Sequence, residues 1–199
     1  MVKVFFPMTG DEDLATVTCV PNDTPQPTDP VAQVIGHLDW TKGVLTTLTA
    51  ARSGTGHDIG RKVKVKFRQA ENCGGNSYQL ALAVSDRMLL EGAPPPGNGR
   101  VFATGEIDPA GEGAVLAIDG LDAKIELLLE RADPGDVFAF PLKNLQKPQE
   151  VTQKTLDGLA ALRERGLIVC PVGHIEELGF LWAAEKSVAS GGSVATGPV

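Results

Sequence analysis

The chain has few cysteines and histidines, the residues that form disulfides and most zinc sites. Its three cysteines, Cys19, Cys73 and Cys170, lie far apart without metal-ligand spacing, and an odd number argues against a disulfide framework. The three histidines form no H-E-x-x-H motif, and we interpret them as surface or helix-capping residues. We therefore predict no metal, no cofactor and a location in the reducing cytoplasm.

Long apolar runs are also missing. The N-terminal residues are apolar as far as Pro7, and acidic residues follow at 11–13, so no extended signal core is present. No segment approaches the roughly 20 apolar residues of a membrane-spanning helix. We therefore predict no membrane partner.

Positive charge is scarce as well. The formal net charge of -7 argues against a nucleic-acid partner, because that affinity depends mainly on clustered lysine and arginine. In the locally basic residues 61–68, charged and apolar residues alternate, which is typical of a strand with one exposed face. The overall composition, 42% hydrophobic and 22% charged, is that of an ordinary globular protein.

The first half of the chain is rich in strand patterns. We expect strands within residues 1–20 and at 31–35, 44–48 and 63–67, with 31–35 and 44–48 paired through a turn at 41–43. Residues 21–30 contain four prolines and are expected to form a loop. The glycine-rich residues 53–60 lack the spacing of a phosphate-binding loop, and we interpret them as a flexible loop.

Strands and helices alternate in the second half. Periodicity predicts helices at 77–90, 121–132, 152–165 and 174–185, and strands at 100–107, 114–118, 137–142 and 167–172. The expected fold class is therefore α/β or α+β, with mixed sheets packed against helices. We expect a single domain over residues 1–189 and a flexible tail at 190–199.

Chemistry is concentrated between residues 73 and 124. The stretch C-G-G-N-S-Y-Q-L-A-L-A (73–83) places glycines before Ser77, at the start of an apolar helix. Glycines such as Gly75 let a backbone approach a substrate closely, and N–H groups at the start of the helix could stabilise an oxyanion. The alternative is that Ser77 is simply the N-cap of this helix.

The same region ends in V-L-A-I-D-G-L-D-A-K (115–124), which places Lys124 one turn inside a second apolar helix. Leu121 and Leu128 fall on the same side of that helix, so the lysine is expected to lean toward the core. A serine needs a base to become a good nucleophile, and burial can lower the pKa of a lysine from its usual value of roughly 10.4 so that it can be that base. The alternative is a lysine whose stem covers apolar surface while its ammonium stays in water.

Three motifs occur in order: G-x-S at a helix start, A-T-G-E-I at 103–107, and V-L-x-I-x-G-L-x-x-K at 115–124. Together they resemble the proteolytic domain of the Lon protease family. The sequence G-H-L-D-W-T at 36–41 is similar to a strand of that family, and residues 167–178 are similar to its closing strand and helix.

The resemblance implies a Lon-like fold and a serine endopeptidase in which Ser77 and Lys124 form a catalytic dyad. It also implies that Thr104 orients Lys124, that Glu106 continues the same motif, and that Gly75 and Asn76 lie beside the nucleophile. The substrate would be a protein or peptide. The family implies a ring-shaped homo-oligomer and a possible AAA+ ATPase partner or larger assembly, and this chain has no Walker motif of its own.

The chain departs from the family pattern on both sides of the serine. Gly74 and Asn76 stand where the family usually has an acidic residue and a proline, and Tyr78 and Gln79 stand where it has alanine and glycine. Tyr78 is bulky, and Gln79 follows it. These side chains could fill the cleft. A second hypothesis is therefore an inactive Lon-like domain that acts as a binding or ring-assembly module.

Overall fold

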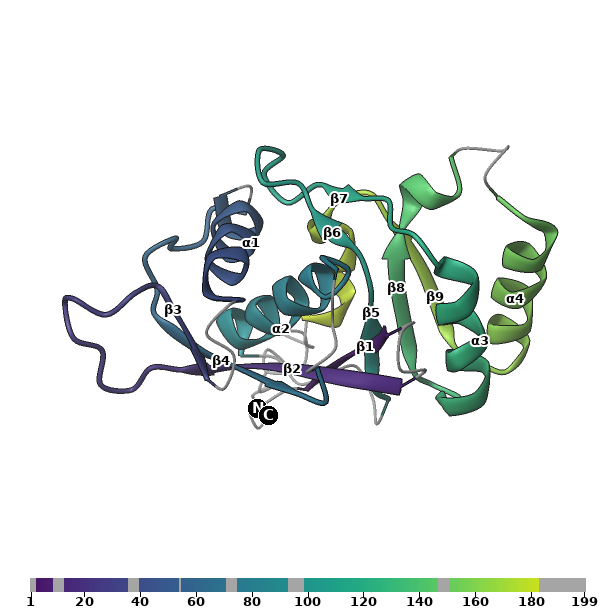
Figure 1. Cartoon of the computed structure of the whole chain (residues 1–199), viewed down its shortest axis with the longest axis horizontal. Helices are drawn as coiled ribbons and strands as arrows, with labels where there is room; N and C mark the ends of the chain where they lie inside the picture. Colours follow the sequence, from purple (N-terminus) through teal and green to yellow (C-terminus); the bar gives the residue numbers. More distant parts are fainter. Residues whose placement is uncertain are drawn as a thin grey trace, which may run out of the picture.

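The computed structural model describes residues 3–8, 13–35, 40–53, 55–70, 75–92, 99–146 and 151–182. Over these ranges the chain forms a seven-stranded mixed sheet, a two-stranded sheet and four α-helices (Figure 1). The predicted mixed α/β class is therefore confirmed. Among the described helices, none has both the length and the apolar character needed to cross a membrane.

The large sheet has the strand order β3-β4-β2-β1-β5-β8-β9. The β1–β2 and β2–β4 pairs are antiparallel, and the remaining neighbours are parallel. The seven strands are β1 (Val4–Met8), β2 (Asp13–Pro21), β3 (Ala32–Ile35), β4 (Val63–Arg68), β5 (Val101–Ala103), β8 (Val137–Pro141) and β9 (Ile168–Val172).

Helices cover both faces of this sheet. Successive side chains of a strand point to opposite faces, so a strand whose residues are all apolar needs cover on both. On one face, Val101 and Ala103 of β5 join the hydrophobic core that contains α1 (Thr41–Ser53) and α2 (Gln79–Glu91). On the other face, Phe102 joins a second core with α3 (Leu121–Arg131) and α4 (Gln153–Glu164). The molecule therefore has two separate hydrophobic cores with the sheet between them.

Shorter elements complete the fold. A small hairpin is formed by β6 (Glu106–Ile107) and β7 (Val115–Leu116), which pair in antiparallel register. Two 3-10 helices follow later in the chain, η2 (Leu142–Asn144) and η3 (Ile175–Leu181). The predicted single strand at 100–107 is therefore wrong. It divides into β5 and β6, with Thr104 and Gly105 between them.

The predicted strand at 44–48 is also wrong, because these residues lie in the middle of α1, and the predicted turn at 41–43 is the first turn of that helix. Val44, Leu48 and Ala51 are buried at helical spacing against the core shared with α2. Gly43 permits this packing, since a Cβ at that position would lie 2.8 Å from the Tyr78 hydroxyl oxygen. Tertiary packing has overridden the strand-like alternation of these residues.

Three other expectations concern segments at the limits of the described chain. In the 36–41 motif, Thr41 begins α1, and residues 36–39 lie outside the described ranges. The predicted helix at 174–185 is the 3-10 helix η3, which ends at Leu181. The predicted tail at 190–199 lies outside the described residues.

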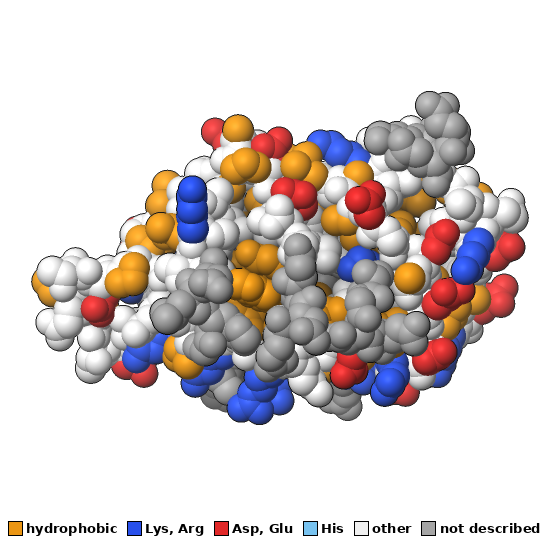
Figure 2. Space-filling view, in the orientation of Figure 1, with side chains coloured by type: hydrophobic (Ala, Val, Ile, Leu, Met, Phe, Trp, Pro, Cys, Tyr) orange, Lys and Arg blue, Asp and Glu red, His pale blue; other side chains and the backbone are white. Residues whose placement is uncertain are grey.

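The basic strand has the predicted exposed face. In β4, Val63, Val65 and Phe67 are buried, while Lys66 and Arg68 are exposed. Lysine and arginine side chains gather along the lower edge of the molecule (Figure 2). At the α3–α4 end the exposed charges are of both signs (Figure 2). The basic stretch is thus explained by strand geometry.

A buried ion pair joins α1 to α2. Arg52 donates from Nε and Nη2 to the two carboxylate oxygens of Asp86, at 2.8 and 2.7 Å, and both residues are 2% exposed. Burial by itself lowers the pKa of Arg52, but the hydrogen bond and charge of Asp86 hold that pKa above its usual value. Burial and the same carboxylate raise the pKa of the Cys19 thiol, so Cys19 is a neutral core residue.

Candidate active site

Ser77 and Lys124 meet in the folded chain. The Lys124 Nζ lies 3.2 Å from the Ser77 Oγ, although the two residues are 47 positions apart in the sequence. Lys124 is 3% exposed, whereas Ser77 is half-buried. The structure therefore places the two predicted catalytic side chains within hydrogen-bonding distance, with the amine in the interior and the hydroxyl nearer the surface.

The two residues meet at an opening in the large sheet. The pairing of β1 with β5 ends at Phe5 and Phe102, whereas β1 continues beside β2 as far as Met8. Lys124 comes from the α3 layer and donates to the main-chain carbonyl of Pro7, at 2.8 Å. Ser77 comes from the α2 layer on the other face. The Ser77–Lys124 pair therefore spans the sheet at the point where β1 and β5 separate.

Ser77 lies in the turn that leads into α2. The N-cap of α2 is Tyr78, which makes no side-chain cap hydrogen bond, so the alternative of Ser77 as the N-cap is wrong. The Gly105 N–H donates to the Ser77 carbonyl and the Leu80 N–H donates to the Gly105 carbonyl, each at 2.9 Å. These two bonds fasten the serine turn to the residues that follow β5.

Gly105 favours this close approach, because a side chain at this position would crowd its neighbours. A Cβ at position 105 would lie 3.1 Å from Val115 Cγ1 and 3.2 Å from Leu80 Cβ. Thr104, which precedes it, is fully buried, and its hydroxyl donates to the Ser77 carbonyl at 3.4 Å. The A-T-G-E-I motif therefore contacts the backbone of the turn that contains Ser77 directly.

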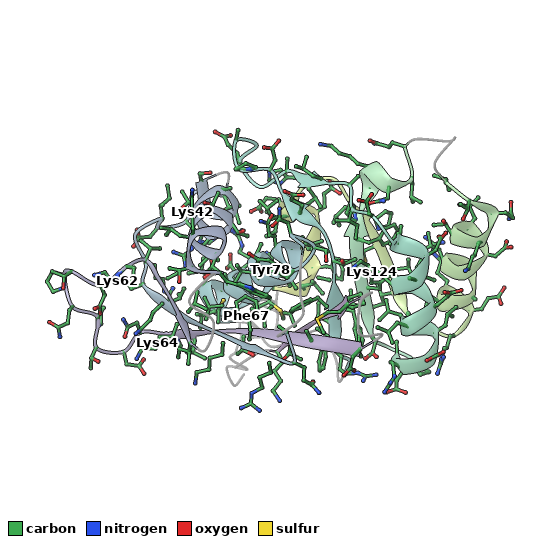
Figure 3. All side chains as sticks on the ribbon, in the orientation of Figure 1. Lys42, Lys62, Lys64, Phe67, Tyr78 and Lys124 are labelled. Atoms are coloured by element: carbon green, nitrogen blue, oxygen red, sulfur yellow. The ribbon has the colours of Figure 1, made fainter. Side chains whose placement is uncertain are left out.

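Lys124 does not reach toward the solvent. Its side chain is buried, and its amine bonds to the Pro7 carbonyl and the Ser77 hydroxyl in the interior. The alternative in which the ammonium stays in water is therefore wrong. In Figure 3, Lys124 lies between α3 and the large sheet, and Tyr78 lies to one side of it, over α2.

Two polar contacts fix the start of α3, and the sequence patterns did not reveal either. The Asn144 amide of η2 accepts from the Ile118 N–H at 3.1 Å and donates to the Ile118 carbonyl at 2.7 Å. In the first turn of α3, Asp122 accepts hydrogen bonds from the hydroxyls of Thr152 and Thr155 at the start of α4. Lys124 is thus carried on a helix whose N-terminus is held from two directions.

Tyr78 packs in the core. Its side chain is 5% exposed, and its ring stacks on Trp40, with centroids 4.8 Å apart. The rings of Phe6 and Phe67 also contact it, at centroid distances of 6.4 and 5.6 Å. Figure 3 shows Tyr78 and Phe67 close together. The bulky Tyr78 ring, which departs from the Lon family pattern, therefore packs within a cluster of aromatic side chains.

Gln79 is likewise engaged in structure. Its Oε1 accepts from the buried Ile107 N–H at 2.9 Å, which ties β6 to the first turn of α2. Beside it, the Asn76 amide donates to Glu106 Oε1 at 3.0 Å, and both of these residues are accessible to solvent. Gly75 is exposed, and a Cβ there would meet no atom within 4 Å. The predicted supporting residues therefore surround the serine turn.

Replacing Gln79 with alanine is expected to destabilise the fold by about 1–3 kcal/mol, because the Ile107 N–H is buried and would lose its acceptor. Urea unfolding measures this as a lower midpoint with an unchanged slope. The control is Gln33→Ala on the exposed side of β3, which should change the midpoint little. Equal midpoints for the two variants would show that the Gln79 contact contributes nothing.

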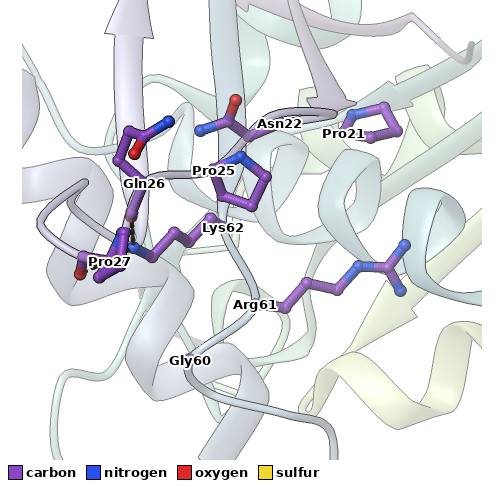
Figure 4. A pocket seen from close by; sticks show the side chains of 8 residues that line it. All are labelled: Pro21, Asn22, Pro25, Gln26, Pro27, Gly60, Arg61 and Lys62. Atoms are coloured by element: carbon purple, nitrogen blue, oxygen red, sulfur yellow. Dashed lines mark hydrogen bonds between the residues drawn. The ribbon is translucent and has the colours of Figure 1, made fainter.

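A separate cavity lies far from this site. It has a volume of about 470 Å³ and is open to solvent. Its walls are formed by the proline-rich loop and the residues before β4, as Figure 4 shows: Pro21, Asn22, Pro25, Gln26, Pro27, Gly60, Arg61 and Lys62. Lys62 donates to the carbonyls of Gln26 and Pro27. Figure 3 places Lys62 and Lys124 toward opposite ends of the molecule, so this cavity is not part of the serine site.

The predicted histidine roles hold where the structure describes them. His174 is the N-cap of η3, where its Nδ1 accepts from the Glu176 N–H at 3.2 Å. His57 pairs with Glu91 at 3.3 Å. His37 and Cys73 lie outside the described residues. Within the described part of the chain, no three His, Cys, Asp or Glu side chains converge as metal ligands would.

A comparison with models of protein families finds no match to this chain, and a search of curated proteins finds no similar sequence. The functional assignment therefore depends on the residues and contacts described above.

Proposed function

We propose that this chain is a serine endopeptidase that hydrolyses peptide bonds through a Ser77–Lys124 dyad, with a Lon-like fold and without ATP hydrolysis of its own. The observation that carries the proposal is the 3.2 Å contact between the Ser77 Oγ and a lysine amine that is 3% exposed. A buried amine favours its neutral form, and a neutral amine can accept the serine proton.

In the first half of the reaction, the Lys124 amine takes the Ser77 hydroxyl proton as Oγ attacks the substrate carbonyl carbon. A tetrahedral intermediate forms, and its oxygen carries the negative charge. The Lys124 ammonium then gives the proton to the leaving nitrogen, and the C–N bond breaks. The products of this step are a free amine and an acyl ester on Ser77.

In the second half, Lys124 is neutral again and accepts a proton from a water molecule. The oxygen of that water attacks the ester carbonyl, and a second tetrahedral intermediate forms. Return of the proton to Ser77 Oγ breaks the ester bond. The acid product leaves, and both side chains regain their starting forms.

The serine turn also offers a donor for the oxyanion. The N–H groups of Gln79 and Leu80 already donate to the carbonyls of Asn76 and Gly105. The Ser77 N–H, in contrast, donates to no acceptor among the described residues. We assign the oxyanion contact to this N–H, since an unengaged backbone donor beside the nucleophile is suited to that charge.

The buried Tyr78 and the Gln79–Ile107 contact favour an accessible serine, because neither side chain is available to fill the cleft in the conformation described. This weakens the hypothesis of an inactive binding or ring-assembly module. We further propose a cytoplasmic location, because three widely spaced cysteines fit a reducing compartment better than a disulfide framework. By similarity to the Lon family, we also propose a ring-shaped homo-oligomer and delivery of substrate by an AAA+ ATPase or larger assembly.

The test is cleavage of an unfolded protein together with labelling of the nucleophile. The chain is incubated with fluorescently labelled casein, and separately with a β-lactone, whose ring opens to form an ester on an activated serine. We expect casein fragments and a mass increase on the peptide that contains Ser77. Intact casein together with an unmodified Ser77 would contradict the proposed function.

A further inference from the structure

The Lys124 amine has a second fixed partner, the main-chain carbonyl of Pro7 at 2.8 Å. Pro7 is buried in β1 and lies 117 positions from Lys124 in the sequence. The same amine bonds to the Ser77 Oγ. A strand carbonyl of the large sheet is therefore a direct neighbour of the dyad.

The residue type at position 7 explains why this carbonyl is accessible to a lysine. The β1–β5 ladder ends at Phe5 and Phe102, two residues before Pro7. Proline has no N–H and cannot donate to a neighbouring strand, so it cannot extend this ladder. On its other side β1 remains paired with β2, where Pro7 lies opposite Leu14. One edge of β1 is thus open at Pro7, and Lys124 occupies that opening.

The contact also suits the chemistry of a lysine base. A neutral amine has two N–H groups and one lone pair. An N–H held by the Pro7 carbonyl restricts rotation of the amine, which helps to direct the lone pair at Ser77 Oγ. After proton transfer the amine is an ammonium, and a carbonyl oxygen stabilises that charge through the same hydrogen bond.

We propose that Pro7 is a positioning residue for the dyad: its missing N–H ends the β1–β5 pairing, and its carbonyl orients the Lys124 amine and stabilises the ammonium. This inference rests on the proposed function, since it concerns how the base of that reaction is held.

A backbone ester tests the role of the carbonyl. Residues 1–18 are synthesised with the α-hydroxy analogue of Met8, which converts the Pro7–Met8 amide into an ester with a weaker acceptor oxygen. Cys19 allows this peptide to be joined to residues 19–199 by native chemical ligation, with no added residue. The joined chain is then folded. The matched control is an ester at Phe6, which changes the Phe5 carbonyl in the same strand.

The expected result is a loss of about tenfold in kcat for the Met8 ester, with KM unchanged, because a hydrogen bond to the reacting base is weakened. The Phe6 ester should keep the kcat of the all-amide ligated chain. The urea unfolding midpoints of the two ester chains are also compared. Equal midpoints show that a difference in kcat does not come from a difference in fold stability.

A second measurement does not depend on activity. Residues 19–199 are produced with 13C-labelled lysine, and the Lys124 Cε signal is assigned with a Lys124→Met variant. The Met8 ester should move the titration of this signal to lower pH, because the acceptor that favours the ammonium is weaker. The Phe6 ester should leave it unchanged.

The outcomes separate the two proposals. If both esters match the all-amide chain in kcat and in the Lys124 titration, the role of Pro7 is overturned while the endopeptidase proposal stands. If the all-amide chain neither cleaves casein nor is labelled at Ser77, the endopeptidase proposal fails, and the Lys124 titration still decides whether the Pro7 carbonyl holds the amine.

Discussion

Loss of either the Ser77 hydroxyl or the Lys124 amine is expected to reduce casein cleavage by about three orders of magnitude or more, and loss of both is expected to cost no more than either loss alone. Residues that act as one unit in catalysis show this non-additivity, because removing the first already disables the second. The variants are Ser77→Ala, Lys124→Met and the double variant. Initial rates of fragment release measure the effect.

The variant Lys124→Arg tests whether position 124 must accept a proton or need only carry a positive charge. Arginine keeps a cation at the site but remains protonated at all pH values used, so it cannot accept the serine proton. We therefore expect it to be as inactive as Lys124→Met. Full activity of this variant would show that position 124 supplies only positive charge or packing.

Matched controls for the dyad come from residues outside the site. Ser53 is exposed at the end of α1, and Lys154 is exposed on α4, where it pairs with Glu126. Ser53→Ala and Lys154→Met should keep the parental rate. Urea unfolding shows whether each inactive variant is folded. Two folded single variants with independent, multiplying losses would contradict the dyad.

Replacing Asp86 with alanine is expected to destabilise the fold by about 3–5 kcal/mol, the largest stability effect that we predict. The Arg52 guanidinium would remain buried without its carboxylate, in a pair where both side chains are at most 2% exposed. Arg52 also donates from Nη1 to the carbonyl of Arg61, at 2.7 Å. The substitution would therefore weaken the contact between α1, α2 and the segment that leads into β4.

A second variant identifies the cause of this loss. In Arg52→Met with Asp86→Leu, both charges are replaced by apolar side chains of similar size, and much of the lost stability should return. The exposed pair of Lys154 and Glu126 is the control, since Glu126→Gln should cost less than about 1 kcal/mol. Urea midpoints measure all three variants. A cost for Asp86→Ala equal to that of Glu126→Gln would show that the buried charge is not the cause.

Regular patterns in the sequence predicted much of the fold. Helix α3 and its end near Arg131 follow from the spacing of Leu121, Ile125 and Leu128, which are all buried. The end of α2 was predicted from Gly92, because glycine often ends a helix in the left-handed conformation. The structure shows Gly92 in that conformation. Residues 44–48 were misassigned because their short apolar alternation fits a strand, whereas packing against the core shared with α2 favours the helix.

The candidate site was predicted in part. Ser77 and Lys124 lie in motifs with an order and spacing that suggested a common site, and they are within hydrogen-bonding distance. Pro7 and Asn144 were not assigned roles, and the contact of Gln79 with Ile107 was not predicted, because these contacts depend on how distant segments meet. A proline within a predicted strand was the one local signal, since it marks an edge that cannot continue a ladder.

The position of the dyad between two hydrophobic cores has a mechanical consequence. Ser77 precedes a helix that packs in one core, and Lys124 belongs to a helix that packs in the other. A displacement of one helical layer past the other would change the Oγ–Nζ distance directly, and a misplacement of about 1 Å can cost on the order of 100-fold in rate. A ligand that shifts α3, for example by displacing α4 in the core that the two helices share, is therefore expected to alter kcat without touching Ser77 or Lys124.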